Sequence, residues 1–174
     1  TWAEGLLSLK VDDTEDSCLA GNFLCPACAA MHGRTIDIVW PMTWLWSRTG
    51  DQRYLDAAVD AVHWGKCNMQ KADGSYINDP NHTWRGITVF SQTALGKALV
   101  NFSDILPEEV RDDWRALFDI QTEYIFNWMS EPGMEVNSNY RAAFPLAMEL
   151  AYRLSGQERF RLSAAEQVKR VLSC

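Results

Sequence analysis

The sequence predicts an all-α protein built from helical hairpins. Apolar residues recur at intervals of three and four through most of the 174 residues, and no segment alternates as a half-buried strand would. The stretch TGDQRYLDAA (49–58) also returns as SGQERFRLSAA (155–165), with glycine, arginine and an aromatic residue at matching offsets. A third short join near 103–107 lies midway between them, so the repeating unit is one helical hairpin.

Helical spacing predicts the individual elements in order. The expected helices cover 37–50, 52–69, 87–102, 107–129, 139–156 and 158–172, preceded by a short helix at 2–9. Gly50 is a natural helix stop, whereas Pro41 belongs in a first turn or at a kink. Pro107 followed by two glutamates is typical of a helix start.

Composition limits the classes of function. A net charge of −7 and a pI near 4.9, with no lysine and arginine cluster, argue against a nucleic-acid partner. No apolar run approaches the ~20 residues that a membrane span needs. The eight tryptophans are unusual, and those near loops suit stacking on a sugar ring.

Three joins are long and rich in Gly, Pro, Asn and Asp, whereas the alternate joins are short. The long ones precede His32, cover 70–83 and cover 130–138. In a hairpin array, alternate joins lie on opposite faces, so all three long loops are expected on one face. Long polar loops that lead into helix N-termini are common places for binding and catalysis.

The TGDQRYLDAA join, the DGSY turn (73–76) and the tryptophan-rich helices resemble the (α/α) toroids of carbohydrate-active enzymes. These include alginate- and heparinase-type polysaccharide lyases and unsaturated-glucuronyl hydrolases, and the resemblance covers 31–172. It implies an N-terminal segment with a cysteine-containing loop (1–30) and about three hairpins over 31–174. A closed toroid needs more, so further hairpins of the same natural chain are expected partners; a shorter, open array is the alternative.

The first long loop ends in MHGRTID, which places His32, Arg34 and Asp37 at a helix start. His32 could transfer a proton near neutral pH, and Arg34 could bind a carboxylate in bidentate fashion. The competing interpretation is that His32 caps the helix and Arg34 pairs with Asp37.

The second long loop gathers Asp79, His82, Trp84 and Arg85. Asp79 could act in acid–base catalysis while Trp84 stacks on a sugar. Alternatively, Asp79, Pro80 and Asn81 only shape a turn and Thr83 caps the next helix.

The third long loop leads into NSNYRAAF, which offers four polar residues at a helix start: Asn137, Asn139, Tyr140 and Arg141. In the toroidal lyases an asparagine neutralises the uronate carboxylate, and tyrosine and histidine serve as base and acid. The resemblance therefore implies these roles for Asn139 and Tyr140, although no histidine adjoins them. Helix capping by asparagine is the alternative.

These residues leave three functions open, with a poly- or oligosaccharide as the expected substrate. β-Elimination needs charge neutralisation beside a base, and arginines at 34, 85 and 141 favour a uronate. Glycoside hydrolysis needs two carboxyl groups ~5–9.5 Å apart, which Asp37 and Asp79 could supply. A non-catalytic helical array that binds glycans or proteins is the third.

The motif CPACAAMH (25–32) allows several uses of its cysteines. A thioredoxin-like dithiol would require a βαβ frame that the sequence does not predict. No cofactor is expected beyond one alternative, a zinc site formed by Cys18, Cys25, Cys28 and His32. A disulfide from Cys18 to Cys25 or Cys28 is another, if the protein is exported. Cysteines that shape the loop and so present His32 and Arg34 are the favoured interpretation.

Overall fold

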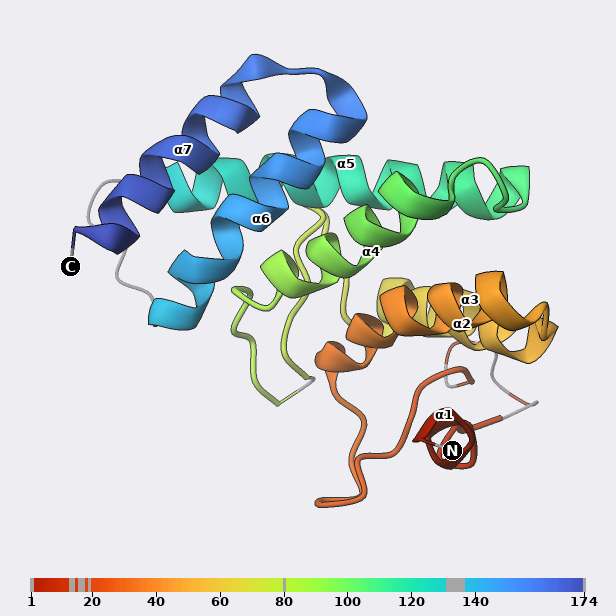
Figure 1. Ribbon diagram of the computed structural model, residues 1–174. Helices are drawn as coiled ribbons and strands as arrows, with labels where there is room; N and C mark the ends of the chain where they lie inside the picture. The colour runs from red at the N-terminus through yellow and green to blue at the C-terminus, as the bar shows by residue number, and fades with distance from the viewer. Residues whose placement is uncertain are drawn as a thin grey trace. The chain divides into compact units, whose positions relative to one another are not determined.

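A computed structural model describes residues 2–12, 15, 18, 20–79, 81–130 and 137–173. Seven α-helices and one 3-10 helix form this part of the chain (Figure 1). Their bounds are α1 Trp2–Leu7, η1 Gly33–Ile38, α2 Val39–Thr49, α3 Gln52–Asn68, α4 Thr88–Phe102, α5 Glu108–Ser130, α6 Ser138–Ser155 and α7 Glu158–Leu172. The predicted all-α class is confirmed, and the extended pairings among the described residues are isolated bridges.

The chain divides into two compact units. Unit 1 comprises 1–71 and 76–87, and unit 2 comprises 72–75 and 88–174. Unit 1 contains α1, η1 and the α2–α3 hairpin, together with the first long loop and the second apart from 72–75. Unit 2 contains the α4–α5 and α6–α7 hairpins, with α6 packed on α4 as well as on α7.

The two copies of the sequence repeat make the same kind of helix join. Gly50 and Gly156 each follow a helix in the left-handed conformation, with φ of 71° and 70°. Each glycine donates its N–H to the carbonyl four residues earlier, on Trp46 and Tyr152. A residue without a Cβ is favoured there, which explains why these two helix ends could be located from the sequence.

The predicted helix starts match the structure less closely than the predicted ends at Gly50 and Gly156 do. The helix expected from residue 37 begins as the 3-10 turn η1, which the α-helix continues from Val39. The idea that Thr83 caps the following helix is wrong, because α4 begins five residues later, at Thr88. The Asp73 turn is confirmed: its Oδ1 accepts hydrogen bonds from the N–H and hydroxyl of Ser75, at 3.1 and 2.6 Å.

Unit 2 has a tightly packed core where α4 meets α5 and α6. A Cβ built on Gly96 of α4 would lie 2.6 Å from the Phe118 ring and 3.1 Å from Leu150 Cβ. Beside it, the fully buried Gln92 donates from Nε2 to Thr122 Oγ1 (2.9 Å) and to the Ala147 carbonyl (3.1 Å). The close approach of the three helices therefore depends on a missing side chain and on a buried polar contact.

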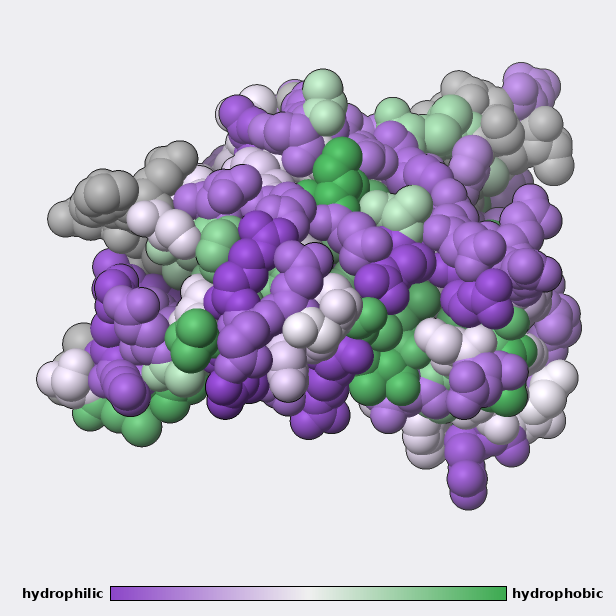
Figure 2. Space-filling view, turned by 90° about the horizontal axis from the view of Figure 1, so that it is seen from above, coloured by the Kyte–Doolittle hydropathy of each residue, from purple (hydrophilic) through white to green (hydrophobic). Residues whose placement is uncertain are grey.

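Polar side chains cover much of the face drawn in Figure 2, where hydrophobic residues form separate patches. Among the described residues, no helix combines the length and apolar character that a membrane crossing requires.

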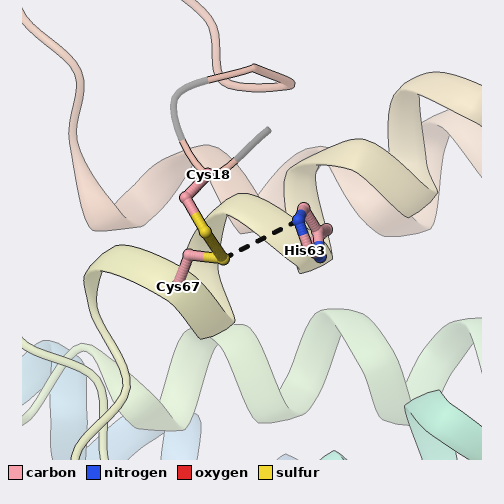
Figure 3. Close-up of side chains that lie close together, drawn as sticks. All are labelled: Cys18, His63 and Cys67. Atoms are coloured by element: carbon pink, nitrogen blue, oxygen red, sulfur yellow. Dashed lines mark hydrogen bonds between the residues drawn. A yellow bond between two sulfur atoms is a disulfide. The ribbon is translucent and has the colours of Figure 1, made fainter. Parts of the chain in front are cut away.

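A disulfide joins Cys18, in the N-terminal segment, to Cys67 near the end of α3, with Cα atoms 5.5 Å apart (Figure 3). Asn68 reinforces this attachment by donating from Nδ2 to the Cys18 carbonyl. The two Cys18 alternatives, a bond to Cys25 or Cys28 and a fourth zinc ligand beside them, are therefore wrong. Cys18 is bonded to Cys67 of α3, whereas Cys25 and Cys28 remain thiols.

We expect Gly96→Val to destabilise unit 2 by about 1–3 kcal/mol, because the added side chain would overlap Phe118 and Leu150. Urea unfolding followed by tryptophan fluorescence measures this change. Gly5→Val is the matched control: a Cβ on this helical glycine meets nothing within 4 Å. Equal stability of the two variants would contradict the packing argument.

Replacing Cys18 and Cys67 together by serine should lower the free energy of unfolding by about 2–5 kcal/mol, because the disulfide closes a loop with a sequence separation of 49. Urea unfolding with and without a reductant tests this. Reductant should lower the stability of the wild type to that of the double variant and leave the variant unchanged. A reductant-insensitive wild type would show that the bond does not stabilise the fold.

Candidate functional site

Two of the three long loops are joined within unit 1 by a main-chain contact. The Gly33 N–H donates to the Asn78 carbonyl at 2.7 Å. A Cβ on Gly33 would lie 2.6 Å from the Ile77 carbonyl oxygen and 2.7 Å from Ile87 Cδ1, so only glycine fits without a shift of the main chain. The contact places the His32 end of the first loop beside the Asp79 segment of the second.

Asp79 is at the centre of the second loop. Its Oδ2 accepts a hydrogen bond from Asn78 Nδ2 at 2.8 Å, and its Oδ1 accepts from the Asn81 N–H at 2.9 Å. Main-chain bonds in both directions link Asp79 to His82, at 3.0 and 3.3 Å. The expectation that these residues shape a turn is confirmed for Asp79 and Asn81, while Pro80 lies outside the described residues.

The electrostatic environment keeps Asp79 ionised. Burial favours the neutral carboxyl, but it is outweighed by the hydrogen bonds from Asn78 and Asn81 and by the nearby His82 and His32. The pKa of Asp79 therefore lies below its ordinary value of 3.8. His82 is exposed and His32 half-buried. We call His32, Asn78, Asp79 and His82 the Asp79 cluster.

Asp37 is in a different environment. Arg34 donates from Nε to Asp37 Oδ2 at 2.7 Å, and a second guanidinium nitrogen lies 2.5 Å from the same oxygen. Burial raises the pKa of Asp37 above its ordinary value, although the ion pair with Arg34 opposes this. The predicted Arg34–Asp37 pairing is confirmed. The His32 side chain does not cap η1, and its Nε2 instead lies 3.1 Å from Cys28 Sγ.

Trp84 and Arg85 follow the Asp79 cluster before α4. Trp84 is half-buried, and Gly86 lies against its indole. A Cβ built on Gly86 would lie 2.7 Å from atoms of the indole ring. Arg85 is exposed. Gly86 therefore packs against one edge of the Trp84 indole.

The residues expected from the third loop belong to unit 2. Asn137 precedes α6, and its carbonyl accepts the Tyr140 N–H at 3.0 Å, but its side chain makes no capping bond. Asn139 is exposed, whereas Tyr140 is only 8% exposed and packs against Phe90, with ring centroids 5.4 Å apart. Arg141 lines a hollow of about 120 Å³ with Ser138, Gln167, Arg170 and Val171. The capping role suggested for the asparagine side chain is therefore wrong at Asn137.

Comparison with known proteins assigns the chain to a family. The model of the ulvan lyase N-terminal domain matches residues 1–174. The chain belongs to this family. It is 27% identical over 146 residues to the broad-specificity ulvan lyase of Formosa agariphila, a match that covers 83% of the chain and 23% of that relative. No solved structure matches this ulvan lyase N-terminal domain significantly.

Membership in a polysaccharide lyase family agrees with the resemblance drawn from the sequence, at the level of the enzyme class. Within the ulvan lyase domain, sequence reasoning missed Asn78 and Gly33. Asn78 directly precedes Asp79, so an asparagine next to a candidate carboxylate was the available signal. Gly33 could not be interpreted, because its partner lies 45 positions away in the chain.

Because its pKa is lowered, Asp79 stabilises the ulvan lyase domain above pH ~4, and this contribution is lost as the pH falls through its folded pKa. Asn78→Ala removes one hydrogen bond to the carboxylate and should raise the pKa of Asp79. Carboxyl ¹³C NMR titration measures this pKa directly, and urea unfolding between pH 7 and 3 should show a weaker pH dependence.

Asn101→Ala is the control for this experiment, since Asn101 donates to the Lys97 carbonyl and not to a carboxylate. An Asp79 midpoint that does not change in Asn78→Ala would refute the assigned cause.

Proposed function

We propose that this domain supplies part of the active site of a lyase that cleaves a uronate-containing polysaccharide by β-elimination. Ulvan, the polymer named in the related enzyme, is the first substrate to test. The chain corresponds to less than a quarter of that relative's length. The proposal therefore concerns the contribution of this domain within the whole enzyme.

The observation that carries the proposal is an ionised Asp79 carboxylate with two histidines nearby in the Asp79 cluster. β-Elimination begins when a base removes the proton from the carbon next to the uronate carboxylate. His82 is exposed and linked to Asp79 through the main chain, so it can reach a substrate. A nearby carboxylate can stabilise the positive charge that the imidazole of His82 gains when it takes the proton.

The expected roles of the other residues follow from charge. A uronate becomes more acidic at the reacting carbon when its carboxylate is neutralised by cations or by amide and hydroxyl donors. Arg85 of unit 1 is exposed and could be the cation that neutralises the uronate carboxylate. In unit 2, Arg141 lines the small hollow and could bind an anionic group of a sugar, whereas Arg170, which also lines it, is paired with Glu166. Trp84 would stack on a sugar ring.

Asn137, Asn139 and Tyr140 remain part of the proposal as implied by the toroidal lyases. Asn139 is exposed at the start of α6 and could bind a uronate carboxylate through its amide. Tyr140 is buried against Phe90, so it would act as a base or acid only at the tip of its side chain. An (α/α) toroid completed by further hairpins of the natural chain is the architecture that we propose for the whole domain.

The hydrolase alternative requires one carboxylic acid and one carboxylate on either side of the sugar. Asp37 and Asp79 have pKa values shifted in opposite directions, as that mechanism needs. However, the Asp37 carboxylate is bound to Arg34, and the family is one of lyases. We therefore favour elimination, and the product distinguishes the two reactions.

The test is ulvan cleavage by the full-length protein, followed by the ultraviolet absorbance of the new C=C bond. His82→Ala should lower kcat/KM by about 10²–10⁴-fold, because it removes the proposed base. His63→Ala is the matched control: His63 is an exposed histidine on α3 beside the Cys18–Cys67 disulfide.

Three outcomes would overturn parts of the proposal. Reducing ends without ultraviolet absorbance would indicate a hydrolase. Binding of the polysaccharide without cleavage by the wild type would indicate a binding module. Full activity of His82→Ala would show that the Asp79 cluster does not supply the base, and the proposal of a lyase would still stand.

A further inference from the structure

Two thiols and an imidazole gather at the end of the first long loop. The Sγ atoms of Cys25 and Cys28 and a ring nitrogen of His32 all lie within 4.8 Å of one another. We propose that these three residues form a zinc site with one coordination position left open. The proposal rests on the geometry of this loop and does not depend on the lyase function.

The distances suit a tetrahedral ion. Zinc binds sulfur at about 2.3 Å and imidazole nitrogen at about 2.0 Å, so neighbouring ligands in a tetrahedral site are roughly 3.5–3.8 Å apart. Cys28 Sγ and His32 Nε2 are 3.1 Å apart, so they need to separate by only a few tenths of an ångström. The C-x2-C spacing of Cys25 and Cys28 is the one common in zinc sites.

The main chain holds the two cysteines in a tight turn. The Cys25 N–H donates to the Ala30 carbonyl at 3.0 Å, and the Ala29 N–H donates to the Cys25 carbonyl at 2.8 Å. Ala29 adopts φ of 54°, the left-handed region that a residue with a Cβ rarely enters. The N–H groups of Ala27 and Cys28 point at Cys25 Sγ. The turn therefore brings both sulfur atoms to one point, within 4.8 Å of each other.

A second group of two cysteines and one histidine, Cys18, His63 and Cys67, contains a disulfide instead of two free thiols (Figure 3). There the two sulfur atoms are joined in a disulfide, which leaves no thiolate for a metal, and His63 Nε2 lies 3.7 Å from Cys67 Sγ. A disulfide is typical of an oxidising compartment. Under such conditions two thiols three residues apart are prone to oxidation, and a bound metal would protect them.

The chemistry of the three ligands selects the ion. Two thiolates and one neutral imidazole favour zinc over the hard cations magnesium and calcium. Binding releases the two thiol protons to the buffer. Cys28 is exposed, so water or an anionic oxygen of a ligand can take the fourth position. With Nε2 on the metal, His32 would be a ligand, and proton transfer in the Asp79 cluster would be left to His82.

The experiment measures metal content and affinity in the full-length protein. Purified without an affinity tag of histidines, the wild type should hold one zinc per chain by elemental analysis. Cobalt(II) added to the chelator-stripped protein should produce thiolate-to-cobalt charge-transfer absorption. Cys25→Ser, Cys28→Ser and His32→Asn should each weaken zinc binding by more than about 100-fold in a chelator competition, since even outer-shell changes cost about 10–100-fold.

His63→Asn is the matched control and should retain the zinc of the wild type, because its neighbouring cysteines are in the disulfide. Thiol labelling followed by intact mass separates the outcomes. Two protected thiols that become reactive after chelation support the site. A Cys25–Cys28 disulfide without metal, or zinc that is lost in His63→Asn and kept in His32→Asn, would overturn the proposal.

Discussion

The main-chain contact between Gly33 and Asn78 is the constraint on which the candidate site depends. It joins two loops that the sequence separates by the whole of the α2–α3 hairpin, and it tolerates no side chain at position 33. The hydrogen bond orients the start of η1, and with it His32, relative to the Asp79 turn. The α2–α3 hairpin lies between the two loops in the sequence, and its helices are joined at the left-handed Gly50.

The two carboxylates of this region show how local surroundings assign different chemistry to one residue type. Asp79 is held ionised by an amide, a main-chain N–H and two imidazoles, so it can stabilise positive charge on a neighbour. Asp37 is more buried and is committed to Arg34. The ionised Asp79 is the carboxylate on which the proposed elimination relies, and the chain belongs to a polysaccharide lyase family.

The four cysteines within the described residues fall into two pairs with different surroundings, one a disulfide and the other two free thiols. Cys18 and Cys67 tie the N-terminal segment to the last turn of α3, so their effect is on stability. Cys25 and Cys28 stay as thiols in a turn that ends at His32 and therefore at the Asp79 cluster. The first loop thus contains a disulfide cysteine, Cys18, and a proposed set of zinc ligands that begins seven residues later, at Cys25.

The sequence by itself determined the helices and the ends of α2 and α6, because helical periodicity and the glycines at 50 and 156 act through neighbours within one or two turns. It also identified Asp79, His82 and His32 as polar residues of long loops. Only the tertiary structure decided that Cys18 pairs with Cys67, that Gly33 meets Asn78 and that Tyr140 is buried against Phe90. These contacts join positions about 45–50 residues apart, and no local preference specifies which distant segments pack together.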